Sequence, residues 1–228
     1  HQGNAAFLAG QPLLGQLLTA GSRWPREEQK AALLFLLNVT HEAAAGCRAA
    51  CSGGGLNALV DLFLRLGGQT AGLGEDGAHE YELVNLLLGL LINVVEKDEA
   101  LRSDLAALCR HEAAASPRGP AGPCADGGGL LHLLCRLIFA GQRVAEKAKA
   151  EEEVTADMVT TSEAKGESTI NRAYASILLG FIICDDAPMK DAVARILPGE
   201  SLESLVDALE EFSQFLNIVV RHDGSTGH

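Results

Sequence analysis

Three long segments of the chain are apolar around nearly the whole circumference of a helix. They read KAALLFLLNVTHE (Lys30–Glu42), NLLLGLLINVVEKDE (Asn85–Glu99) and YASILLGFIICDDAP (Tyr174–Pro188), and each ends in polar or acidic residues. Leucine and alanine dominate them rather than β-branched residues, which favours helix over strand. A helix without a polar face needs neighbours on several sides, so we predict three core helices stacked side by side.

The same succession of patterns follows each core segment. A shorter helical stretch comes first, reading AAAGCRAACS, ALRSDLAALCRH or MKDAVARI. A break follows, at Gly53–Gly55, Gly127–Gly129 or Pro198–Gly199, and then an amphipathic helix in which Leu56, Leu130 and Leu202 hold equivalent places. Glycine relaxes the backbone and permits a sharp turn between helices. This is the order of an armadillo repeat read from its third helix. We therefore predict an all-α, armadillo/HEAT-like right-handed α-solenoid of about three irregular repeats.

The spacing of the core segments indicates loop insertions. Asn38 and Asn93 are 55 residues apart and Asn93 and Cys184 are 91 apart, against a unit of roughly 40–47 residues in such repeats. We expect flexible loops at Gly67–Gly77 and in the proline-rich Ser116–Gly128. A charged stretch at about 143–168 has few large apolar residues, and its TTSEAKGES end is expected to be disordered. The prediction is one domain over 1–228 with a flexible insertion.

Composition narrows the possible partners. The net charge is −12, so we expect no direct contact with nucleic acid, which is itself a polyanion. The longest apolar run, Leu83–Val95, has 13 residues and is too short to cross a membrane. The six cysteines are expected to be reduced and mostly buried. Because the chain begins with His1 rather than methionine, we expect it to be part of a longer protein.

No pattern of residues indicates catalysis, a metal or a cofactor. HEAAA occurs at His41 and again at His111, but the second histidine that a zinc protease needs four residues later is alanine. A set of possible zinc ligands has irregular spacing and is better explained by buried thiols and surface histidines: Cys109, His111, Cys124, His132 and Cys135. We expect a protein-binding chain rather than an enzyme.

Long blocks of the sequence resemble a known family. LLNVTHE, LGLLINVVE and ILLGFIICDDAPMKDAVARILPGESLESLVDALEEFSQFLNI are similar to the C-terminal domain of the Wapl (wings apart-like) cohesin-release factors, from about Ala31 to Ile218. The resemblance implies a nuclear, chromatin-associated protein that opens the cohesin ring and so regulates sister-chromatid cohesion. The implied partners are the ATPase head, kleisin and HEAT-repeat subunits of cohesin, and the HEAT-repeat cohesin regulator. Family members also have a long N-terminal region and a further helix after the position of Ile218.

Two sets of residues are candidates for binding. Asn38 and Asn93 occupy the place where some armadillo proteins hold an asparagine ladder that pairs with a peptide main chain. The alternative is that each amide bonds a neighbouring helix end. The acidic ends of the core helices form a second candidate, a contact ridge of Glu42, Glu96, Lys97, Asp185 and Asp186. An alternative function is that of a generic armadillo adaptor or transport scaffold for extended peptides.

Overall fold

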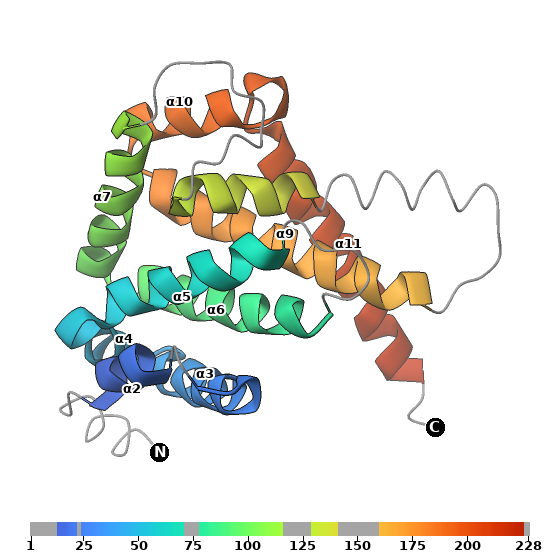
Figure 1. Cartoon of the computed structure of the whole chain (residues 1–228). Helices are drawn as coiled ribbons and strands as arrows, with labels where there is room; N and C mark the ends of the chain where they lie inside the picture. The colour runs from blue at the N-terminus through green and yellow to red at the C-terminus, as the bar shows by residue number, and fades with distance from the viewer. Residues whose placement is uncertain (1–12, 22–23, 71–77, 116–128, 141–159, 226–228) are drawn as a thin grey trace.

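The computed structural model describes residues 13–21, 24–70, 78–115, 129–140 and 160–225. Every regular element in these ranges is helical, which confirms the all-α prediction for the described part of the chain (Figure 1). Within the same ranges, no helix is both long enough and apolar enough to cross a membrane.

The first set of three helices begins at a proline. Pro25 precedes α3 (Arg26–Thr40), whose first turn carries Glu27 and Glu28, as the positive end of a helix dipole favours. The shorter α4 (Ala44–Cys51) follows, then the 3-10 turn η1 (Ser52–Gly54) and α5 (Gly55–Thr70). Gly53 has a φ of 58°, in the region that favours glycine. An additional helix, α2 (Leu13–Gly21), precedes this set and packs against α5 and α4.

The succession recurs twice, as the sequence predicts. The second set consists of α6 (Ala78–Lys97), α7 (Glu99–Ala115) and a helix over residues 130–140. The third consists of α9 (Thr160–Ile183), α10 (Ala187–Ile196), the turn η3 (Pro198–Glu200) and α11 (Glu203–Ser225). Each set, called a trio below, therefore contains a core helix (α3, α6 or α9), a second helix and a third helix.

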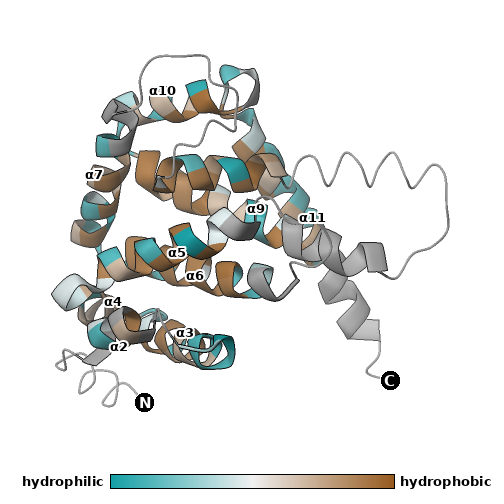
Figure 2. Ribbon diagram, viewed as in Figure 1, coloured by the Kyte–Doolittle hydropathy of each residue, from teal (hydrophilic) through white to brown (hydrophobic). Residues whose placement is uncertain are grey.

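The core helices pack against one another. α6 contacts α3 on one side and α9 on the other, and α5 also packs against α6. Leu91 of α6 and Leu178 of α9 are fully buried, as expected. Figure 2 shows the hydrophobic residues gathered along α5, α6 and α9 in the middle of the molecule. The C-terminal ends of α3, α6 and α9 lie at the edge where α4, α7 and α10 begin (Figure 1).

Two predicted loops are partly helical. Residues 67–70 belong to α5, where Gly67 packs so closely that an added Cβ would lie 2.8 Å from a methyl group of Leu133. Residues 160–168 are the first turns of α9, although TTSEAKGES was expected to be disordered. The buried second half of α9 provides the nucleus, and extending an existing helix costs little. The remaining parts of these predicted loops (71–77 and 143–159), the whole of 116–128, and Glu152, expected to be solvated, lie outside the described residues.

The first core helix is less enclosed than its sequence suggests. Leu34 and Phe35 of α3 are each 42% exposed, so α3 has an apolar surface open to solvent. An apolar circumference therefore does not guarantee burial on every side.

Candidate functional site

The burial pattern aligns the three core helices without gaps. Buried positions of α3 recur 55 residues later in α6, and those of α6 recur 88 residues later in α9. The matched sets are Leu33, Leu36, Val39 and Thr40; Leu88, Leu91, Val94 and Val95; and Ser176, Leu179, Ile182 and Ile183. The residue equivalent to Asn38 and Asn93 is therefore Phe181, and the sequence alignment with Cys184 was wrong by three residues.

The two asparagines have different surroundings. The amide nitrogen of Asn93 donates to the hydroxyl of Thr40 (3.1 Å) and to the carbonyl of Leu37 (3.4 Å), which joins α6 to the end of α3. Asn38 is exposed, and its amide donates to the carbonyl of Leu34 in its own helix (2.9 Å). The helix-end interpretation is correct for Asn93 but not for Asn38. The amide of Asn93 is hydrogen-bonded within the fold, and the equivalent position of the third core helix holds Phe181. The three positions therefore do not form an asparagine ladder.

At each boundary between trios, a side chain at one position of the second helix contacts the core helix of its own trio and the core helix of the next trio. Cys47 of α4 and Arg102 of α7 are equivalent, because each lies four residues after the N-cap of its own helix. The thiol of Cys47 donates to the carbonyls of Thr40 (3.4 Å) and Asn93 (3.5 Å). Arg102 donates to the equivalent carbonyl of Val95 (2.8 Å), and its guanidinium lies 5.5 Å from the ring centre of Phe181. We call these the first junction and the second junction.

Aspartates cap two of the three second helices. Asp98 accepts from the main-chain nitrogens of Ala100 (3.1 Å) and Leu101 (3.2 Å), and Asp186 accepts from that of Met189 (3.0 Å). Such a side-chain acceptor satisfies donors that the first turn of a helix leaves unpaired. The equivalent residue of the first trio is Ala43, which has no side-chain cap bond.

Each capping aspartate also pairs with an arginine of the preceding trio. Arg48 of α4 contacts Asp98 at 2.6 Å, and Arg110 of α7 contacts Asp186 at 2.9 Å. The Arg48 hydrogen bond, followed by the main-chain bond from Leu101, lowers the pKa of Asp98. Sequence reasoning missed Asp98 and both arginines. An acid directly before a second helix, as in KDEALR and DDAPMK, was the available signal for the caps.

The residues of the predicted contact ridge differ in their exposure and in their partners. Glu42, Glu96 and Asp185 are exposed at the ends of the core helices. Lys97 pairs with Glu96 at 3.0 Å, and this neighbour raises its pKa. Asp186, by contrast, caps α10 and pairs with Arg110, so it acts within the fold. Reversing the charge of Asp186 would remove this cap bond and this ion pair, so Asp186 is not counted among the exposed acids of the ridge.

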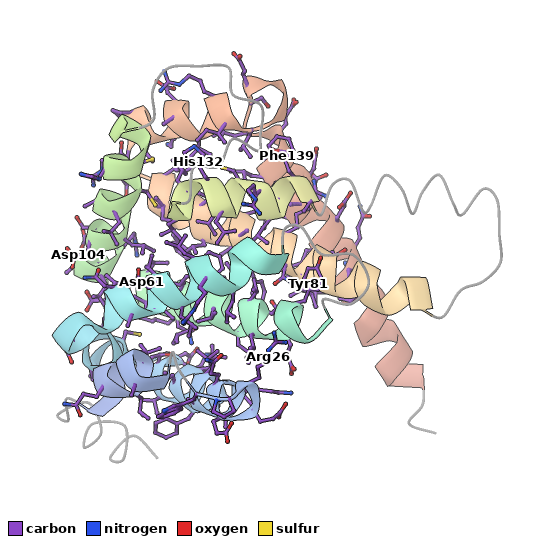
Figure 3. The ribbon with its side chains drawn as sticks, in the orientation of Figure 1. Arg26, Asp61, Tyr81, Asp104, His132 and Phe139 are labelled. Carbon is purple, nitrogen blue, oxygen red and sulfur yellow. The ribbon has the colours of Figure 1, made fainter. Side chains whose placement is uncertain are left out.

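The described cysteines do not form a metal site. No cluster of three or more potential metal ligands occurs in the described part of the chain, although Cys124 lies outside it. Burial raises the pKa of Cys135 to about 12, which keeps this thiol protonated. Cys109 is also buried, whereas Cys184 is exposed. Figure 3 shows apolar side chains filling the space between helices, while His132 is half-buried and the labelled Asp61 and Asp104 are exposed.

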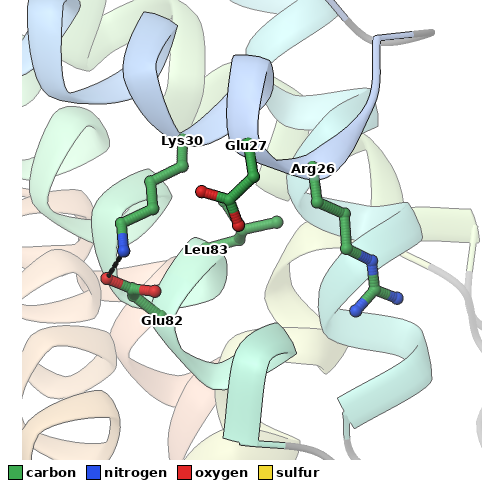
Figure 4. A pocket seen from close by; sticks show the side chains of 5 residues that line it. All are labelled: Arg26, Glu27, Lys30, Glu82 and Leu83. Atoms are coloured by element: carbon green, nitrogen blue, oxygen red, sulfur yellow. Dashed lines mark ion pairs between the residues drawn. The ribbon is translucent and has the colours of Figure 1, made fainter.

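A small pocket lies at the opposite end of the core helices. Its volume is about 130 Å³, and it is lined by Arg26, Glu27, Lys30, Glu82 and Leu83 (Figure 4). Lys30 of α3 contacts Glu82 of α6 at 2.6 Å across it, and this bond raises the pKa of Lys30. The lining has balanced charge and a volume well below the ~300–1,000 Å³ of typical ligand pockets. We interpret it as an ion-paired contact between α3 and α6.

Comparison with known proteins identifies relatives of the chain. No protein-family model matches it. It is 27% identical to Wings apart-like protein 2 of Arabidopsis thaliana over 202 residues, covering 81% of this chain and 24% of the relative. It is 26% identical to Wings apart-like protein 1 of the same plant over 204 residues, covering 81% and 21%. Protein wings apart-like of Drosophila melanogaster matches 36% of the chain at 27% identity. The chain spans about a quarter or less of the length of these relatives, and it is related to the wings apart-like family.

Proposed function

We propose that this chain is a protein-interaction region of a Wapl-like cohesin-release factor, which promotes the dissociation of the cohesin ring from chromatin in the nucleus. The observation that carries the proposal is the match of 81% of the chain to two Wings apart-like proteins. The proposed partners are the ATPase head, kleisin and HEAT-repeat subunits of cohesin, together with the HEAT-repeat regulator.

We also propose that the trios form a right-handed armadillo/HEAT-like solenoid. Three observations support this arrangement: the recurring order of helices, the gapless match of burial between core helices, and the repeated arginine–aspartate pairs between neighbouring trios. Neighbour-to-neighbour contacts of this kind are typical of repeat proteins.

The chain is proposed to act by binding rather than by catalysis. The polar groups at the junctions have structural partners, as Asn93 bonds Thr40 and Asp98 pairs with Arg48. The engagement of Asn93 also removes the main support for an adaptor that holds extended peptides on an asparagine ladder.

Within this proposal, the exposed acids Glu42, Glu96 and Asp185 are the contact ridge. They lie at the ends of three successive core helices and belong to a chain with a net charge of −12. An acidic surface of this kind favours a basic partner surface and a faster encounter at low salt.

The test measures binding of the chain to purified cohesin subunits across a salt series. We expect the triple variant Glu42→Lys, Glu96→Lys and Asp185→Lys to weaken binding by more than tenfold at low salt. A charge-matched control, Glu28→Lys, Asp61→Lys and Asp104→Lys, changes three exposed acids elsewhere and is expected to stay within about threefold. Equal weakening by the two variants would contradict the ridge. No binding by the unaltered chain would contradict the proposed function.

A further inference from the structure

Two positions of neighbouring core helices come together at each interface between trios. At the first interface, Lys30 of α3 and Leu83 of α6 line the same small pocket (Figure 4). The gapless match between core helices makes Asn85 of α6 the equivalent of Lys30. It makes Asn171 of α9 the equivalent of Leu83. Because α6 packs against α9 as it does against α3, Asn85 and Asn171 face each other across the second interface.

The polar contact at this level differs between the two interfaces. At the first, Lys30 of α3 pairs with Glu82 of α6 at 2.6 Å. At the second, Asn85 stands in place of Lys30, and Ile170 of α9 stands in place of Glu82. These two residues cannot form a salt bridge, so the polar groups at the matched positions are the amides of Asn85 and Asn171.

The amides of both asparagines contain buried atoms without a hydrogen-bond partner in the protein. These atoms are Oδ1 of Asn85 and both Oδ1 and Nδ2 of Asn171. Asn171 is only 2% exposed, so bulk solvent does not reach its amide. A buried polar group without a partner destabilises a fold, and nearly all such groups in proteins bond another protein group or an ordered water. The two amides therefore indicate a ligand bound between α6 and α9.

The chemistry of the three atoms indicates which ligand fits. Each Oδ1 accepts a hydrogen bond, whereas Nδ2 of Asn171 donates. A cation would be opposed by the amide donor, and an anion would be opposed by the two oxygens. Water both donates and accepts, and a buried water makes about three hydrogen bonds. The requirements of the two side chains match that number.

We propose that Asn85 and Asn171 bind an ordered water molecule between α6 and α9. The water accepts from Nδ2 of Asn171 and donates to Oδ1 of the same amide. Its second hydrogen is donated to Oδ1 of Asn85, so all three buried atoms are satisfied. This bridge takes the place at the second interface that the ion pair of Lys30 and Glu82 has at the first. The water site belongs to the fold and is independent of the proposed function.

The direct test is NMR spectroscopy of the unaltered chain. The side-chain amide protons of Asn171 are expected to show a cross-peak with water whose sign indicates a residence time longer than molecular tumbling. The matched control is the amide of Asn38, which is exposed and contacts short-lived surface water. No cross-peak of that sign is expected from Asn38. Because this measurement needs no substitution, it stands even where a variant fails to fold.

A second test compares single and double substitutions in chemical denaturation. Leucine has the branched shape of asparagine, so Asn85→Leu and Asn171→Leu each remove one amide and leave the other without its bridge. Each single variant is expected to lower the unfolding midpoint. The double variant removes both polar groups and is expected to lose clearly less than the sum of the two single losses.

The control for the second test combines Asn171→Leu with Asn38→Leu. Asn38 lies on α3 and bonds its own helix, so these two losses are expected to add.

Three results would overturn the proposal: additive losses for Asn85 and Asn171, no long-lived water at the amide of Asn171, or a direct hydrogen bond between the two amides. A crystal structure distinguishes the last case. It would show either a water within about 2.7–3.2 Å of both side chains or the two amides in contact.

Discussion

The two junctions perform the same task with different chemistry. At the first junction, a buried thiol contacts the end of α3 and the main chain of α6, and an amide–hydroxyl bond supports it. At the second, a guanidinium contacts the end of α6 and lies over an aromatic ring of α9. The first is closed by small neutral groups, the second by a large cation. The two junctions therefore share the pattern of buried positions, whereas the polar groups that fill the equivalent positions differ.

The largest loss of stability is expected when a buried side chain of the core common to both junctions is truncated. Leu91→Ala and Leu178→Ala each remove a fully buried side chain from α6 or α9 and should lower the free energy of unfolding by about 2–5 kcal/mol. Chemical denaturation measures the loss. A much smaller loss for one of them would indicate that its trio unfolds independently of the other.

Removing a cap should produce the next largest effect. Asp98→Ala deletes the acceptor for two main-chain donors of α7 and should cost about 0.5–2 kcal/mol. Asp98→Asn keeps an acceptor and should recover most of that loss. If alanine and asparagine were equally destabilising, the charge rather than the cap would be responsible.

Supplying the absent cap should stabilise the first trio. Ala43 has φ −128° and ψ 89°, nearly the angles of the capping Asp186, at φ −124° and ψ 90°. Ala43→Asp therefore needs no backbone change and should add about 1 kcal/mol. Thermal unfolding of the single variant, with Ala43→Val as the control that lacks an acceptor, measures the gain.

The smallest expected effect concerns pH. Arg48 lowers the pKa of Asp98 in the folded chain, so this pair stabilises the fold above the ordinary aspartate pKa, and the contribution is lost as pH falls through the lowered value. Arg48→Gln should cost under about 1 kcal/mol at pH 7, because Arg48 is largely exposed. The difference between the two proteins should shrink as the pH falls below the ordinary aspartate pKa and through the lowered pKa of Asp98. A constant difference would exclude the ion pair as its source.

The hydrophobic pattern was sufficient to predict the three core helices and the order of elements in each trio. It could not fix the register of the third, because a shift of three residues moves a helix by nearly one turn and keeps the same face inward. The cap residue Asp186 resolves that ambiguity. The arginine–aspartate pairs were beyond prediction, since they join residues 50 or more positions apart.

Local sequence also misjudged the start of α9 and the end of α5. Glycine and charge in these stretches weaken a helix in isolation, but each continues a helix that is already packed. Gly67 lies in the helix and packs closely against Leu133, rather than forming a flexible loop. The candidate binding ridge was only partly predictable: the pattern DDAPMK indicates a cap at Asp186, but the ion pair of Asp186 with Arg110 joins residues far apart in the sequence.

The thiol at the first junction makes the opening of that junction measurable. Cys47 is fully buried, and burial raises its pKa to about 11, so a thiol reagent reacts with it only while α4 is displaced from α6. The exposed Cys184 reacts without any such opening and supplies the intrinsic rate. In a variant that lacks the other cysteines, the ratio of the two rates gives the equilibrium between the closed and open forms. The chain thus contains a reporter of local unfolding at one boundary between trios.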